Sequence, residues 1–257
     1  MELKEILVVV PHSGILIPGE IPIGSLSDDF PRLMRNVDWY TNWLYNFRDI
    51  LGNSHLAFPY CSLILEANRH PENIDDSVPL KDTLGEPVYR AGNEPTRELR
   101  QFLSDKYLQL FHHDIGEEIA RGKTFLLDAH STVTAKGVAD SQIDLMNFQV
   151  SKPSGEKTYF CPDVYIETYA DELVKRLSWV KVTVNQSKYS NVYGHVCGAH
   201  SINAMTRIGN RVPAILQETN QKLYINEDRT LHWKALETLR RVFAEALQEM
   251  MKKVRLG

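Results

Sequence analysis

Two histidines and one glutamate in this chain stand at or just after the ends of short runs of apolar, β-forming residues. These residues are His12, His130 and Glu218. Because ligands bind at the carboxyl ends of parallel strands in an open α/β sheet, we expect the three side chains to meet there. Two imidazoles and a carboxylate are the parts of a hydrolytic zinc site that keeps one position open for water. In such a site Glu218 would act as the general base.

Each of these residues also has a purely structural interpretation. His12 could hydrogen-bond a loop carbonyl, and Glu218 could belong to a buried ion pair. Asp128, two residues before His130, could cap a turn. The side chains of Asp128 and His130 point to the same side only if the strand continues through residue 130. In that case Asp128 either orients His130 or binds the metal itself.

Alternating strand and helix patterns predict the elements that position these side chains. They indicate a three-layer α/β sandwich with a mostly parallel mixed sheet, formed by residues 1–257 as a single catalytic domain. Asp38 is interpreted as the N-cap of a helix, and Pro95 as part of the first turn of another. The predicted strands are 5–10, 54–58, 62–67, 124–129, 143–148, 180–185 and 212–218. The predicted helices are 39–47, 96–121, 163–178 and 230–253, with loops at 15–31 and 70–95 and a loop containing a short helix at 186–211. The long loop 70–95 suggests a lid.

The composition excludes several classes of function. The chain has 257 residues, a net charge of -4 and no basic block, so we expect no nucleic-acid partner. Its longest apolar run is about six residues, too short to span a membrane. The charged N-terminus does not resemble a signal peptide. Three isolated cysteines, Cys61, Cys161 and Cys197, are typical of a reducing compartment, which favours the cytoplasm.

Asn68 and Arg69 follow another predicted strand and offer a second kind of chemistry. The planar fork of Arg69 suits a substrate carboxylate, and Asn68 can add a neutral hydrogen bond. The alternative is an arginine paired with one of the acids nearby, such as Glu72, Asp75 or Asp76.

Taken in order, these motifs resemble the N-formylglutamate amidohydrolase family, also called N-formylglutamate deformylases, from about residue 6 to 226. This family is related to the zinc carboxypeptidases, which implies a zinc-exopeptidase-like fold. The motifs that carry the resemblance are Pro11-His12-Ser13-Gly14, Asp38-Trp39, Asn68-Arg69, Asp128-Ala129-His130-Ser131, Val184-Asn185, the loop through Tyr193, and Gln217-Glu218-Thr219-Asn220 with Leu223-Tyr224.

The resemblance implies a role for each site residue. His12 and His130 match the histidine ligands of one Zn²⁺ ion, and Glu218 matches the catalytic glutamate. Asn68 and Arg69 match the pair that holds the substrate carboxylate. Two further residues are expected to contact substrate or support the site: His112 and Tyr193.

The third metal ligand must come from a new position. Carboxypeptidases place a glutamate three residues after the first histidine, where this chain has Ile15. Asp38 is the first choice from its place in the family pattern, followed by Asp128 and then Glu20.

The chain departs from the deformylase pattern beside the substrate. Ser62 and Glu66 stand where an arginine and an aspartate are usual, and residues 187–191 replace a glycine-rich stretch. The loss of the arginine removes a second anion contact and leaves the exact substrate open.

The resemblance implies zinc-dependent hydrolysis of N-formyl-L-glutamate to L-glutamate and formate, a cytoplasmic step of amino-acid degradation that belongs to histidine catabolism. The expected partner is a small N-acyl amino acid. The alternatives are a zinc carboxypeptidase, a deacylase of another N-acyl amino acid, or a carboxylate-binding relative without activity.

Overall fold

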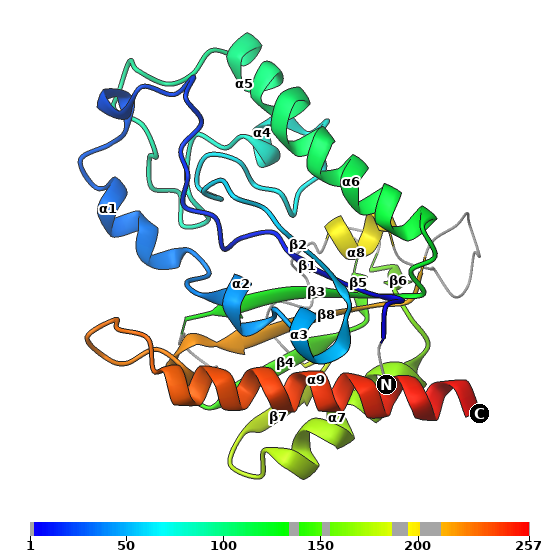
Figure 1. The fold of residues 1–257 in the computed structure, drawn as a ribbon. Helices are drawn as coiled ribbons and strands as arrows, with labels where there is room; N and C mark the ends of the chain where they lie inside the picture. Colours follow the sequence, from blue (N-terminus) through cyan, green and yellow to red (C-terminus); the bar gives the residue numbers. More distant parts are fainter. Residues whose placement is uncertain (1–2, 134–138, 151–154, 187–194, 201–211, 257) are drawn as a thin grey trace.

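A six-stranded mixed sheet forms the centre of the protein in a computed structural model that describes residues 3–133, 139–150, 155–186, 195–200 and 212–256 (Figure 1). The strand order is β2-β1-β3-β8-β4-β7. All neighbours are parallel except β8 and β4, which are antiparallel. The strands are β1 Ile6–Val10, β2 Ser54–Ala57, β3 Phe125–Thr132, β4 Gln142–Met146, β7 Lys181–Val184 and β8 Ala214–Asn220. The predicted α/β class with a mostly parallel mixed sheet is confirmed.

Helices cover both faces of the sheet (Figure 1). The first face packs against α7 and α9, with α2 and α3 beside α9. The opposite face packs against α5, α6, α8 and the long connections near α1 and α4. The helices are α1 Phe30–Leu33, α2 Thr41–Leu44, α3 Arg48–Leu51, α4 Ile74–Ser77, α5 Arg97–Leu103, α6 Gln109–Ala120, α7 Asp163–Arg176, α8 His195–His200 and α9 Trp233–Leu256. None of the helices in these described ranges is long and apolar enough to cross a bilayer.

Alternation along β3 decides which side chains reach the site. Phe125 and Leu127 enter the core beneath α7 and α9, whereas Leu126 enters the core on the opposite face. Because side chains alternate along a strand, Asp128 and His130 share the face of Leu126. The strand runs on to Thr132, so the condition for these two polar side chains to lie together is met.

Two predicted elements are wrong. Residues 62–67 form no strand; the chain turns there, with the amides of Ile64 and Leu65 both donating to the carbonyl of Cys61. The predicted helix 39–47 is reduced to the single turn of α2, because Tyr40 adopts a left-handed conformation with φ of 60°. Apolar spacing correctly indicated that many of these residues are buried, although Trp43 is 44% exposed, but it did not determine their backbone.

Smaller differences concern the long helix and a missed hairpin. Thr96, whose Oγ1 accepts from the Leu99 amide, is the N-cap of α5, so Pro95 lies just outside the helix. A π-helical turn at Ser104–Leu108 separates α5 from α6. The hairpin of β5 (Phe148–Val150) and β6 (Lys157–Tyr159) was not predicted.

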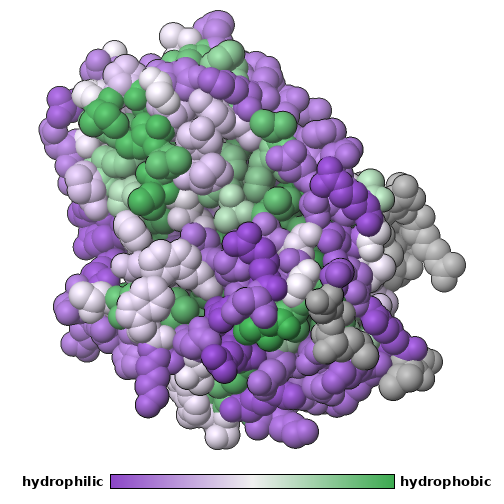
Figure 2. All heavy atoms as spheres, in the orientation of Figure 1, coloured by the Kyte–Doolittle hydropathy of each residue, from purple (hydrophilic) through white to green (hydrophobic). Residues whose placement is uncertain are grey.

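The surface is mostly hydrophilic in the view of Figure 2, with hydrophobic side chains gathered in a few places. Ile15, Leu16 and Ile23, in the long connection after β1, are more than half exposed, at 51%, 54% and 68%. The predicted loop 15–31 thus has little regular structure, with a 3-10 turn at Ile23–Ser25, and contributes apolar side chains to the surface.

Candidate metal and catalytic site

Three side chains from distant parts of the chain converge at the carboxyl ends of β1 and β3. His12 follows β1, Asp38 precedes α2, and His130 lies on β3. Their ligand atoms all lie within 4.8 Å of one another. The Nδ1 atoms of His12 and His130 are 3.1 Å apart. Oδ2 of Asp38 lies 3.8 Å from Nδ1 of His12 and 3.7 Å from Nδ1 of His130. The structure therefore brings together the three residues predicted as metal ligands.

Each imidazole is oriented by a second carboxylate. Asp128 Oδ1 lies 2.9 Å from Nε2 of His130, and Glu66 Oε1 contacts Nε2 of His12. A carboxylate at Nε2 keeps the proton on that nitrogen, so the opposite Nδ1 is free to bind a metal. Both rings thus present Nδ1 toward the position shared with Asp38, an arrangement that suits a divalent cation.

The charges of the site also favour a bound cation. Burial alone lowers the pKa of His130, but Asp128, Asp38 and Glu218 together raise it well above the ordinary value. Burial raises the pKa of Glu66, yet the neighbouring His12 and Arg69 bring it down to about 2. The negative charge of the carboxylates therefore exceeds the positive charge that the histidines can carry. A divalent cation would balance this negative charge.

Asp38 is held by the strand beside it. Its Oδ2 accepts a hydrogen bond from the Ser131 amide at 3.0 Å, and the residue is 5% exposed. The N-cap interpretation is wrong, because α2 begins only at Thr41 and Asp38 forms no capping bond to it.

Glu218 lies beside His130 on the adjacent strand β8. The two residues are partners in the parallel register, and Asp144 is the antiparallel partner of Glu218 on β4. Among the described residues, Oε2 of Glu218 is buried with no hydrogen-bond partner. Burial raises its pKa well above the ordinary value; His130 opposes this effect, while Asp38 and Asp144 add to it. Burial therefore favours the protonated form of this carboxyl group, which suits a group that takes up a proton and passes it on during a reaction.

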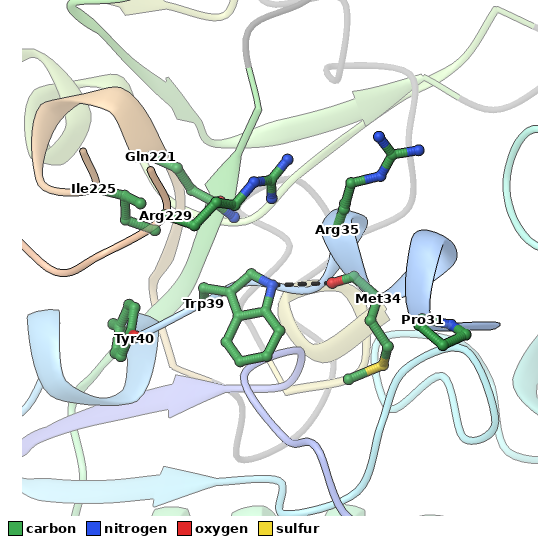
Figure 3. A pocket seen from close by; sticks show the side chains of 8 residues that line it. All are labelled: Pro31, Met34, Arg35, Trp39, Tyr40, Gln221, Ile225 and Arg229. Atoms are coloured by element: carbon green, nitrogen blue, oxygen red, sulfur yellow. Dashed lines mark hydrogen bonds between the residues drawn. The ribbon is translucent and has the colours of Figure 1, made fainter. Parts of the chain in front are cut away.

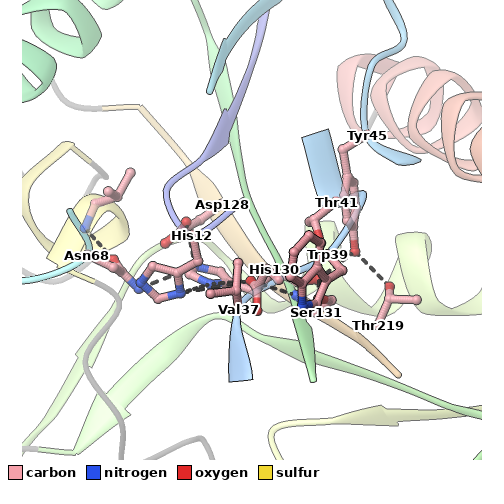
Figure 4. A network of polar contacts seen from close by, with 12 residues as sticks. His12, Val37, Trp39, Thr41, Tyr45, Asn68, Asp128, His130, Ser131 and Thr219 are labelled. Carbon is pink, nitrogen blue, oxygen red and sulfur yellow. Dashed lines mark hydrogen bonds and ion pairs between the residues drawn. The ribbon is translucent and has the colours of Figure 1, made fainter. Parts of the chain in front are cut away.

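Asn68 reaches the site from a turn and not from a strand end. Its Nδ2 lies 3.2 Å from Nε2 of His130, and its Oδ1 accepts from the Val196 amide at 3.1 Å (Figure 4). Arg69 is partly buried, and its Nη1 donates to the carbonyl of Asn68 at 3.1 Å. Asn68 thus packs against the His130 ring and accepts a hydrogen bond from α8, with Arg69 next to it.

The remaining candidates occupy different places. A ring nitrogen of His112, Nε2, lies 2.9 Å from the carbonyl of Ala67, which supports the turn that carries Asn68. Glu20 binds Lys106 at 2.6 Å and Tyr107 at 3.0 Å, outside the metal-ligating group. Tyr193 lies outside the described residues.

Sequence reasoning missed the contact between Glu66 and His12. The two residues are 54 positions apart, and Glu66 was noted only as a departure from the family pattern. The position of Glu66 in the sequence, two residues before Asn68, was the available signal. In the structure the Asn68 amide donates to Glu66 Oε1 at 3.0 Å.

Comparison with known protein families gives one match over most of the chain. The family described as N-formylglutamate amidohydrolase matches residues 4–225. Two curated relatives, both N-formylglutamate deformylases, are 32% identical (Pseudomonas aeruginosa) and 28% identical (Pseudomonas putida) over 142 residues. Each alignment covers 49% of this chain and 51% of the relative, so the chain matches about half the length of these proteins.

Solved structures show the same fold. An N-formylglutamate amidohydrolase from Ralstonia eutropha superposes with a TM-score of 0.75 at 18% identity, covering 100% of this chain and 96% of that one. A gene product of Agrobacterium tumefaciens superposes with a TM-score of 0.67 at 17% identity, covering 96% and 92%.

Proposed function

Because the chain belongs to the N-formylglutamate amidohydrolase family, we propose that it hydrolyses the N-acyl amide of an acidic amino acid. N-formyl-L-glutamate is the first candidate, with L-glutamate and formate as products. The observation that carries the proposal is the convergence of His12, Asp38 and His130 beside the poised carboxyl group of Glu218. A metal centre next to a protonatable carboxyl group is the arrangement that amide hydrolysis needs.

Zinc is the metal that we propose for this centre. Two imidazole nitrogens and one carboxylate oxygen suit Zn²⁺ and leave a position open. His12, Asp38 and His130 would hold it. When bound, the ion supplies Lewis acidity, which makes a water easier to deprotonate and stabilises negative charge on the amide oxygen.

The chain's own residues carry out the proton transfers and the orientation. Glu218 accepts a proton from the attacking water as its oxygen bonds to the acyl carbon. The same carboxyl group then gives the proton to the amino nitrogen as the C–N bond breaks. Arg69, assisted by Asn68, holds a substrate carboxylate so that the amide faces the water. His112 supports the turn that carries this pair, and Tyr193 is proposed as a further substrate contact from its loop.

We place this activity in the cytoplasm. Cys61, Cys161 and Cys197 are all buried and free, which suits a reducing compartment.

The test combines metal analysis with turnover. Purified protein should contain about one equivalent of zinc and release formate from N-formyl-L-glutamate. Glu218→Gln should keep the metal and lose about 10²- to 10⁴-fold in kcat. Glu20→Gln, which removes an acid outside the site, is the matched control. A screen of N-acetyl and N-succinyl amino acids and short peptides completes the assay. Cleavage of peptides alone would identify a carboxypeptidase, and binding without formate release a binding protein.

A further inference from the structure

A separate cavity of ≈ 280 Å³ lies beside the metal-ligating residues. Trp39, the residue after Asp38, forms part of its wall together with Gln221, Arg35 and Arg229 (Figure 3). We call this cavity the Trp39 pocket. It combines an indole surface with two guanidinium groups, which is the chemistry that binds an anion carried on a short apolar chain.

The Trp39 pocket is linked to the metal centre by hydrogen bonds. Nε2 of Gln221 donates to Ser131 Oγ at 3.1 Å, and the Ser131 amide donates to Asp38. In Figure 4 the pair His12 and His130 lies between Asn68 on one side and Trp39 on the other. In that view Trp39, a wall residue of the pocket, lies across the two histidines from Asn68.

Charge distinguishes this pocket from its neighbour. Within the described part of the chain, the charged residues that line the Trp39 pocket are Arg35 and Arg229. A second cavity of ≈ 540 Å³, which Arg229 also borders, contains the acids Asp140 and Glu227. Both arginines are exposed at the pocket, so they can meet an anion from solvent, and among the described residues no lining carboxylate competes for them.

Arg229 is held in a strained conformation. It has φ of 68°, in the left-handed region that a non-glycine residue occupies at a cost. The turn around it is closed by its own amide donating to the Asn226 carbonyl at 3.0 Å and by the Thr230 amide donating to Asp228 Oδ1 at 3.0 Å. The surrounding bonds thus hold an unfavourable backbone that places an arginine at the pocket.

We propose that the Trp39 pocket binds a second carboxylate of the ligand, at the end of a short aliphatic chain. Calling that ligand the substrate rests on the function proposed above. The carboxylate comes either from the acyl group or from the amino-acid side chain, since both can carry one. In either case Arg35 and Arg229 determine specificity for dicarboxylic ligands.

Calorimetric binding of glutarate and succinate tests the pocket without turnover. Arg229→Gly and Arg35→Gln should each weaken binding about tenfold or more, the loss expected of a charge-assisted hydrogen bond. Arg90→Gln, which removes an exposed arginine paired with Asp28, should leave affinity unchanged. Arg229→Gly should also raise the unfolding midpoint, because glycine relieves the positive φ. Higher stability with weaker binding therefore supports the proposal, and unchanged affinity in both pocket variants overturns it.

Turnover then separates the two sources of the carboxylate. If the pocket takes the side chain, Arg229→Gly should lower kcat/KM for N-formyl-glutamate but not for N-formyl-glutamine. If it takes the acyl group, the loss should appear with N-succinyl and not with N-acetyl amino acids. Absence of all hydrolysis would refute the proposed function, whereas the binding result would still decide the pocket.

Discussion

Asp128 and His130 stand two residues apart on β3, and Asp128 Oδ1 lies 2.9 Å from Nε2 of His130. Because both residues lie on this strand, their side chains share one face, and Asp128 is 0% exposed. This geometry suits Asp128 as the partner that orients His130 in the proposed metal site, with Asp38 as the carboxylate beside the two Nδ1 atoms. Glu66 has the same relationship to His12.

Removal of either orienting charge should weaken metal binding. We expect Asp128→Asn and Glu66→Gln each to lower zinc affinity about 10- to 100-fold, because the imidazole loses the partner that fixes its tautomer and its basicity. Competition with a chelator of known affinity measures this change. Glu118→Gln, at a mostly buried acid that pairs with Arg121 outside the metal-ligating group, should behave like the unmodified protein. Equal zinc affinity in all four proteins would exclude an orienting role.

Arg69→Ala should act on substrate binding more than on the chemical step. Loss of a charge-assisted contact of about 1.5–3 kcal/mol corresponds to an increase in KM of about 10- to 100-fold. Steady-state kinetics with a substrate and with its uncharged carboxamide analogue measure the contribution. The carboxamide should give similar KM values for both proteins. A variant with unchanged KM for the carboxylate would remove Arg69 from the substrate site.

Gly14 allows the segment after β1 to approach the segment after β2. A Cβ at this position would overlap the backbone of Pro59 and Tyr60, and Gly14 forms a bridge with Cys61. Gly14→Ala should therefore destabilise the fold by about 3 kcal/mol and displace His12, which lowers zinc affinity as well. Denaturant unfolding measures the change in stability. Gly24→Ala, where a Cβ meets no atom within 4 Å, is the control and should change little.

Strands with a continuous apolar run were predictable from the sequence. β1, for example, is buried on both faces, so its β-branched residues pack against both helix layers. The convergence of His12 and His130 was predictable because His12 follows one such strand and His130 lies on another, whereas Asp38 was predicted from the family pattern.

The errors arise where hydrogen bonds, one set local and one tertiary, determine a backbone that the residue pattern does not reveal. The run Leu63–Leu65 is as buried as a strand, but its amides bond within a turn. The carboxylate of Asp38 accepts from Ser131 on β3 and so is not used to cap a helix. The contact of Asp38 with Ser131 spans 93 positions and could not be inferred from neighbouring residues, whereas the turn after Cys61 is local but is not encoded in the apolar spacing.

His55, on the edge strand β2, should make stability depend on pH. Burial, and to a smaller extent Arg48, lowers its pKa from 6.5 to about 4. Its Nε2 is buried with no hydrogen-bond partner in the described ranges. Between these two pKa values the unfolded chain binds the proton more tightly than the folded chain, so stability falls as the pH drops from 6.5 toward 4.

The contribution of His55 amounts to about 2 kcal/mol of stability lost between pH 7 and pH 5. Denaturant unfolding at both pH values measures it. His55→Gln should lose less stability over this interval than the unmodified protein, because its side chain does not titrate. His113→Gln, which removes an exposed histidine, should retain the full loss. If all three proteins lose the same stability, His55 is not the titrating group.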